Sequence, residues 1–152
     1  MGEKDLHTYK RWFDAGADRY LLRHETANPC HYASLHPPQM SSEHRKECLR
    51  NLKAIGYQTG CGIMVGAPYQ TTEHIAEDLE FMYGLQPEMV GIGPFIPHHD
   101  TPFKDRPAGT LRQTPVSYTH LGGSPIYWRK CLSCPERFYC SPAASIIFWE
   151  LI

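Results

Sequence analysis

Apolar positions in the first part of the chain alternate between helical spacing and short continuous runs. Between residues 5 and 26, an apolar helical face comes first and Gly16 follows it as a stop signal. Residues 18–25 then have the pattern of a strand. The helical face consists of Leu6, Tyr9, Trp12 and Phe13.

The same order is repeated twice. In the second unit Ser41 or Ser42 caps a helix that ends at Gly56, and residues 57–66 form the strand. Its buried stripe consists of Cys48, Leu49, Leu52 and Ile55. In the third unit Thr71 or Thr72 caps a helix that Gly84 and Pro87 break, before a strand at residues 89–96. Its stripe consists of Ile75, Leu79, Met82 and Leu85.

Helices alternating with strands in this way predict an α/β fold with a parallel sheet.

The second and third strands have two different faces. Branched and sulfur-containing residues share one face, namely Cys61, Ile63, Val65, Val90 and Ile92. The opposite face carries mainly glycine, namely Gly60, Gly62, Met64, Gly66, Gly91 and Gly93. We expect the branched face to pack on the helices and the glycine face to leave room for a ligand. The alternative is that these glycines merely ease the twist of the strands.

The most informative polar group is Arg23-His24-Glu25-Thr26, at the end of the first predicted strand. An arginine and a carboxylate two residues apart in a strand point to the same side. Ligands of parallel α/β sheets bind at the carboxyl ends of the strands. Arg23 and Glu25 are therefore candidate ligand-binding residues, and the alternative is a structural ion pair between them.

Composition narrows the class of protein. The 152 residues are 41% hydrophobic and 20% charged, with a formal net charge of −1. This balance provides no basic field for nucleic acid or an anionic membrane. The start of the chain lacks the apolar segment of a secretory signal, and scattered cysteines without such a signal indicate reduced thiols. We therefore expect a cytoplasmic protein with neither a nucleic-acid nor a membrane partner.

Three strings resemble a known family. They are residues 15–29 (AGADRYLLRHETANP), residues 62–66 (GIMVG) and residues 89–98 (MVGIGPFIPH). The chain over about residues 2–111 resembles the radical S-adenosylmethionine (SAM) maturase of FeFe-hydrogenase, of the biotin synthase-like superfamily. The resemblance implies a TIM-type (β/α)8 barrel that cleaves SAM at a 4Fe-4S cluster during assembly of the H-cluster. It also implies other hydrogenase maturases as partners, and a small-molecule or iron-complex substrate.

The resemblance also implies roles for individual residues. Glu25 would contact the ribose or amino-acid part of SAM, Arg45 would pair with its carboxylate, and Met64 would pack near the adenosyl group. Gly66 completes the expected cofactor-binding set. Arg23 would face the central cavity and hold an anionic group of the substrate. The other substrate-cavity candidates are Thr26, Gly93 and His98.

Departures from the family pattern limit what we expect of this chain. The family binds its cluster through Cys-x3-Cys-x2-Cys, and no such spacing occurs here. Three αβ units are present where a barrel has eight, so we expect a fragment: a partial barrel over residues 1–111 that cannot cleave SAM by itself. Residues 112–152 lose the helical and strand periods, and we expect an irregular tail that is non-native or disordered. Tyr69 stands where the family has glycine, which puts the geometry of its loop in doubt.

Cysteine and histidine suggest weaker metal hypotheses. Cys131, Cys134 and Cys140 could hold zinc or an iron–sulfur cluster, but an unstructured tail is the favoured interpretation. His98, His99 and Asp100 follow the third strand and could bind a metal or an anionic substrate, or form a solvated loop. Four histidines have no partner at ligand spacing and are expected at the surface, namely His31, His36, His44 and His74.

Two other functions stay open at this point. One is a related enzyme fragment with biotin synthase-like or methylornithine synthase-like chemistry. The other is a non-catalytic α/β module that binds a nucleotide-like ligand.

Overall fold

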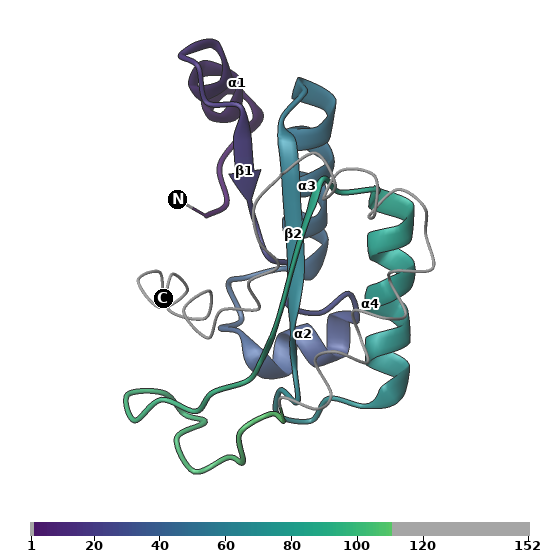
Figure 1. The fold of residues 1–152 in the computed structure, drawn as a ribbon. Helices are drawn as coiled ribbons and strands as arrows, with labels where there is room; N and C mark the ends of the chain where they lie inside the picture. The colour runs from purple at the N-terminus through teal and green to yellow at the C-terminus, as the bar shows by residue number, and fades with distance from the viewer. Residues whose placement is uncertain (1, 111–152) are drawn as a thin grey trace, which may run out of the picture.

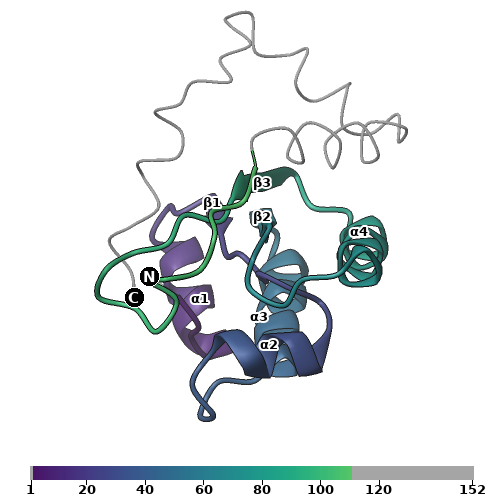
Figure 2. The same ribbon diagram turned by 90° about the horizontal axis from the view of Figure 1, so that it is seen from below.

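The computed structural model describes residues 2–110 of the chain. In chain order, their elements are α1 (Leu6–Asp14), β1 (Arg19–Leu21), α2 (Pro29–Leu35), α3 (Ser42–Ile55), β2 (Gln58–Val65), α4 (Thr72–Leu85) and β3 (Met89–Pro94). The strands are parallel and lie in the order β1-β2-β3, as Figure 1 shows. Seen end on in Figure 2, α1, α2 and α3 lie on one side of the sheet. The predicted parallel α/β fold is confirmed.

Within residues 2–110, no helix combines the length and apolar character needed to cross a membrane.

The ends of the helices follow local sequence signals. The side chain of Ser41 accepts a hydrogen bond from the backbone N–H of His44, and that of Thr71 accepts one from His74. These contacts satisfy N–H groups that have no partner within the helix. Gly56 ends α3 with a left-handed φ of 109°, a conformation that glycine adopts without steric penalty. The capping residues are therefore the first member of each predicted pair.

Two boundaries and one whole helix differ from the prediction. Regular pairing in β1 ends at Leu21, although residues 18–25 were expected to form the strand. Helix α2 was not predicted at all. Its signal is Asn28, whose side chain accepts from the backbone N–H of His31, followed by a proline in the first turn. Helix α4 continues through Gly84 and ends at Leu85, because Gln86 takes a left-handed φ of 51°.

The hydrophobic core lies between the sheet and the helices. Cys61, Ile63 and Val65 of β2 are fully buried against the helix stripes. The other buried members of this core are Tyr9, Tyr20, Leu22, Cys48, Leu49, Leu52, Tyr57, Met82 and Ile92. This confirms that the branched face of the strands packs on the helices, and we call it the helix face. The opposite side of β2 and β3 is the glycine face, made of Gly60, Gly62, Met64, Gly91 and Gly93.

Candidate functional site

The chain that follows β1 remains beside β2 as far as Glu25. Leu22 N donates to Gly60 O at 2.9 Å, and Glu25 N donates to Gly62 O at 3.0 Å. Leu22 and His24 are buried on the helix face. Glu25 adopts a left-handed φ of 64°, which is uncommon for a residue with a side chain. In extended backbone, Arg23 and Glu25 would point to the same side of the sheet. Because the backbone of Glu25 is left-handed, the direction of its side chain depends on this turn as well as on strand alternation.

The Arg23 guanidinium lies over the glycine face at β3. A Cβ placed on Gly91 would lie 3.6 Å from Arg23 Nε, and one on Gly93 would lie 3.6 Å from Arg23 Nη2. Gly91 and Gly93 therefore make room for this side chain. Gly62 has a different role, because a Cβ there would lie closer to Gly91 O than such contacts ever come. The glycines thus accommodate a side chain and a neighbouring strand, while room for a ligand and easier strand twist both stay predictions.

Glu25 is half-buried, and one oxygen of its carboxylate is withdrawn from solvent. Its Oε2 atom is buried and has no hydrogen-bond partner among residues 2–110. Burial raises the pKa of Glu25, while the positive charges of Arg23 and Arg45 oppose that rise. A buried carboxylate oxygen without a donor is costly, so a ligand with hydroxyl or N–H groups would be stabilised here.

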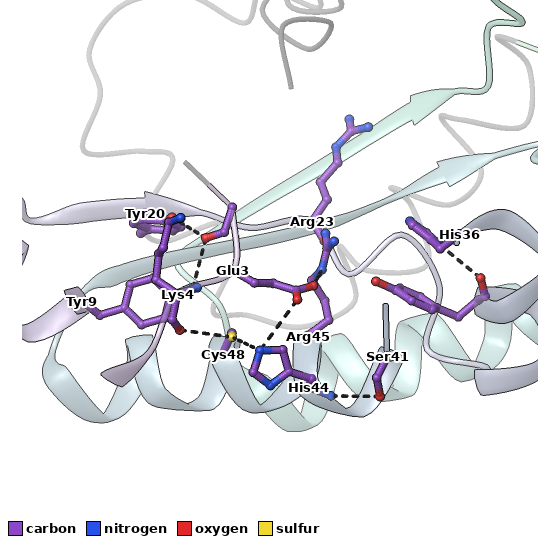
Figure 3. A network of polar contacts seen from close by, with 12 residues as sticks. Glu3, Lys4, Tyr9, Tyr20, Arg23, His36, Ser41, His44, Arg45 and Cys48 are labelled. Carbon is purple, nitrogen blue, oxygen red and sulfur yellow. Dashed lines mark hydrogen bonds and ion pairs between the residues drawn. The ribbon is translucent and has the colours of Figure 1, made fainter. Parts of the chain in front are cut away.

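Arg45 lies in the first turns of α3 and already has two partners. Its Nε donates to Glu3 Oε1, and its Nη1 donates to the carbonyl of Arg23 at 2.8 Å. Its guanidinium carbon is 6.0 Å from the centre of the Tyr32 ring. Figure 3 shows Glu3 alongside Arg45, while the Arg23 side chain extends away from both across the strands. The structure therefore brings Arg23, Glu25 and Arg45 into one neighbourhood, with Glu3 as a member that the sequence did not indicate.

Met64 and Gly66 are held at the end of β2 by the side chain of Gln70. Gln70 Nε2 donates to Met64 O at 2.8 Å, and Gly66 N donates to Gln70 Oε1 at 2.7 Å. Met64 pairs in register with Gly93, so it lies on the glycine face beside the position that Arg23 covers. Tyr69 takes a left-handed φ of 63° despite its side chain. The loop after β2 therefore has a left-handed residue at this position, although the residue is tyrosine and not glycine.

Thr26 belongs to a different environment from Arg23. It is buried, and its hydroxyl lies 3.1 Å from Nδ1 of His31. The other ring nitrogen of His31 is 2.9 Å from Pro68 O, so His31 joins the chain after β1 to the loop after β2. The surface position expected for His31 is wrong, because the side chain is only 3% exposed. The sequence pattern, which was searched only for partners at metal-ligand spacing, could not indicate that His31 is buried by polar contacts within the fold.

A buried pair of titratable groups lies behind the site, on the helix face. His24 Nε2 is 3.7 Å from Asp78 Oδ1, which accepts a hydrogen bond from the backbone N–H of Ala27. Burial lowers the pKa of His24 to about 3, with positive charges on Lys46, Arg45 and Arg23 acting in the same direction. Burial raises the pKa of Asp78 to about 7. Near pH 6 both groups are therefore neutral.

A candidate metal site lies in the chain that follows β3. His98, His99 and Asp100 place one donor atom each within 4.8 Å of one another, and within residues 2–110 they form the cluster of possible metal ligands. Their side chains are between 42% and 80% exposed. Among the described cysteines, Cys30 is exposed while Cys48 and Cys61 are buried. Cys131, Cys134 and Cys140 lie outside the described residues, as does the expected irregular tail.

Comparison with known proteins finds relatives both in sequence and in structure. No protein-family model matches the chain. The chain is 50% identical over 123 residues to the FeFe-hydrogenase maturase subunit HydE of Thermotoga maritima, which covers 80% of this chain and 35% of the maturase. The crystal structure of methylornithine synthase (PylB) matches with a TM-score of 0.68 and 25% identity, covering 85% of this chain and 37% of the synthase. These matches confirm the resemblance to the radical SAM maturase and the partial TIM-type barrel. The chain spans just over a third of the length of each relative.

Proposed function

We propose that this chain forms part of the SAM site of a radical SAM enzyme that acts in FeFe-hydrogenase maturation. The similarity to the maturase supports the enzyme class. The observation that carries the site is the buried Glu25 oxygen without a hydrogen-bond partner, beside Arg23 and Arg45. Cytoplasmic location and other hydrogenase maturases as partners belong to the same proposal.

In this proposal Glu25 accepts hydrogen bonds from the ribose hydroxyls of SAM. A carboxylate binds two neighbouring hydroxyls well, and burial strengthens the interaction because water does not compete. The left-handed backbone at Glu25 supports a role in binding. Such a conformation costs about 1–3 kcal/mol, and residues held in this way concentrate at ligand sites.

The remaining candidates contribute to the two ends of the ligand. Arg45 pairs with the carboxylate of SAM through the N–H groups that Glu3 and Arg23 leave available. Met64 and Gly66 lie beside the adenosyl group. Arg23 holds an anionic group of the substrate above Gly93. Thr26 supports the loop through His31, and His98 contacts the substrate from the chain that follows β3.

The 4Fe-4S cluster of the maturase does not fit the residues of this chain. The sequence lacks Cys-x3-Cys-x2-Cys, and the described cysteines include two that are buried in the core. We therefore assign no reaction step to a cluster held by this chain. After iron reconstitution, the purified chain should produce no 5′-deoxyadenosine from SAM, as measured by liquid chromatography. Formation of that product would contradict the assignment.

Titration calorimetry with SAM tests the binding site directly. We expect the 152-residue chain to bind SAM and the Glu25→Gln variant to bind it at least tenfold more weakly, because the amide replaces an accepting oxygen with N–H donors. Glu80→Gln, an exposed glutamate on α4, is the matched control and should bind as the unsubstituted chain does. Absence of SAM binding to the unsubstituted chain, or equal affinity of Glu25→Gln, would refute the proposal.

A further inference from the structure

The chain that follows β3 forms a loop that is anchored to the sheet. Phe95 N donates to Val65 O of β2 at 2.9 Å, and Gly109 N donates to Phe95 O at 2.8 Å. The ring of Phe103, in the middle of the loop, meets the Phe95 ring edge-on, with 6.5 Å between the ring centres. Figure 1 shows this loop in green beyond the carboxyl end of β3. Residues 96–108 are therefore held at the edge of the sheet where ligands of parallel α/β folds bind.

A turn near the start of this loop brings three candidate metal ligands together. The carbonyl of His98 accepts hydrogen bonds from the Thr101 backbone N–H at 3.1 Å and from the Thr101 hydroxyl at 2.8 Å. His98 Nδ1 lies 3.8 Å from Asp100 Oδ2, and His99 Nε2 lies 3.1 Å from the same oxygen. The turn therefore gathers two imidazoles and one carboxylate at one point.

The separations between these atoms match those around a small metal ion. Zinc binds nitrogen and oxygen ligands at about 2.0–2.2 Å, so two ligand atoms at tetrahedral positions lie about 3.3 Å apart. The distances of 3.8 Å and 3.1 Å to Asp100 Oδ2 lie on either side of this value. The three side chains are accessible to solvent, so small rotations bring the ligand atoms to metal-binding distance without disturbing the core.

His98 presents a ring nitrogen with an available lone pair to this cluster. Asp100 N donates a hydrogen bond to His98 Nδ1 at 3.3 Å. An imidazole nitrogen that accepts a hydrogen bond carries no proton, and a metal binds that form of the ring. The hydrogen bond is long, so a metal ion replaces it at little cost. Metal binding through Nδ1 does not involve Nε2, and it is therefore compatible with contact between His98 and a substrate.

Two imidazoles with one carboxylate favour a particular class of metal. Imidazole suits zinc, iron, nickel and copper, whereas magnesium and calcium prefer oxygen ligands. We propose that His98, His99 and Asp100 bind one divalent first-row transition-metal ion. Because the three ligands come from consecutive residues at the surface, the remaining coordination positions of the ion face solvent and accept an exchangeable ligand. This inference does not depend on the proposed function, because it uses none of the residues assigned to SAM.

Histidine ring signals in nuclear magnetic resonance spectra test the site during titration with zinc chloride. The 15N-labelled 152-residue chain is studied unsubstituted and also with Cys131, Cys134 and Cys140 replaced by serine, which removes a competing set of zinc ligands. In both proteins we expect the ring signals of His98 and His99 to shift together and to saturate with one dissociation constant. Magnesium chloride should shift neither signal.

His99→Asn and Asp100→Asn each remove one metal ligand. By titration calorimetry of the serine-substituted chain, each variant should bind zinc at least about tenfold more weakly. Both side chains are exposed, so neither variant should change the unfolding temperature. His7→Asn is the matched control, because His7 is an exposed histidine on α1, which lies at the other end of the sheet from this loop in Figure 1. It should bind zinc as the parent chain does.

Three results would overturn the inference. The first is a zinc affinity that His99→Asn and Asp100→Asn leave unchanged, because the ion is then bound elsewhere. The second is the absence of zinc-induced shifts of the His98 and His99 ring signals at up to about 1 mM zinc, which would indicate a solvated loop. The third is an equal response to magnesium, which would indicate general attraction of cations to the Asp100 carboxylate.

Discussion

On the helix face of the sheet, Cys61, Ile63 and Val65 are fully buried, whereas the opposite side of the same strand presents Gly60, Gly62 and Met64. Burial of a branched side chain contributes about 1.5–3 kcal/mol, and glycine contributes no side chain at all. The glycine face instead carries Arg23 over Gly91 and Gly93. The comparison indicates that apolar burial is concentrated on one face of the sheet, while the other carries the arginine that the proposed function assigns to the substrate.

Truncation of one leucine on each side of the sheet should give the largest difference in the free energy of unfolding. Leu49 is fully buried against the helix face, while Leu21 is 44% exposed beside Gly60. We expect Leu49→Ala to lower the free energy of unfolding by about 2–5 kcal/mol, because it leaves a cavity in the core. Leu21→Ala should lower it by less than about 1 kcal/mol. Urea unfolding measures both, and equal effects would contradict the division between the faces.

Two glycine substitutions sharpen the comparison within the glycine face. Gly62→Ala should destabilise the protein by about 1–3 kcal/mol, since its Cβ would clash with the backbone at Gly91. Gly93→Ala should change stability by less than about 0.5 kcal/mol, because the nearest atom is the mobile end of Arg23 at 3.6 Å. Thermal unfolding of the two variants distinguishes a steric glycine from one that makes space. A larger loss for Gly93→Ala would reverse these assignments.

The pH dependence of stability tests the buried pair on the helix face. The pKa of Asp78 is raised from 3.8 to about 7, so the folded protein holds this proton more tightly and the contribution to stability is lost as the pH rises from about 4 to 7. The pKa of His24 is lowered from 6.5 to about 3, so its contribution is lost as the pH falls through the same range. The two opposing trends largely cancel in the unsubstituted chain.

Asp78→Asn should remove one of the two trends. The variant keeps an oxygen for the N–H of Ala27, but it no longer titrates. Relative to the unsubstituted chain, its free energy of unfolding should rise by about 1 kcal/mol per pH unit between pH 4 and pH 6.5. Urea unfolding at several pH values measures this slope. A difference between the two proteins that stays constant with pH would show that Asp78 is ionised throughout.

Local signals made much of the fold predictable from the sequence. Helix caps such as Ser41 and Thr71, the stop at Gly56 and the alternation in β2 depend on residues close together in the chain. The missed helix α2 had a signal of this kind in Asn28 and the proline that follows it. The resemblance to the maturase, carried by residues 15–29 and 89–98, suggested a SAM site, which local patterns could not indicate.

Contacts between distant residues were beyond the sequence. Glu3 meets Arg45 across 42 positions, and Ala27 meets Asp78 across 51 positions. No spacing rule connects such residues, because tertiary packing alone brings them together. The left-handed backbone of Glu25 and the burial of His31 are also consequences of that packing. The sequence therefore indicated Arg23, Glu25 and Arg45 as candidates, but it did not indicate that Arg45 pairs with the carboxylate of Glu3.

Nuclear magnetic resonance of the 15N-labelled chain during titration with SAM tests the function of the glycine face most directly. We predict that the amide signals that shift belong to Arg23, Glu25, Arg45, Gly66 and Gly93. The signals of Leu49, Leu52 and Met82, which pack against the helix face, should stay in place. Shifts concentrated on the helix face, or no shifts at any SAM concentration, would contradict it.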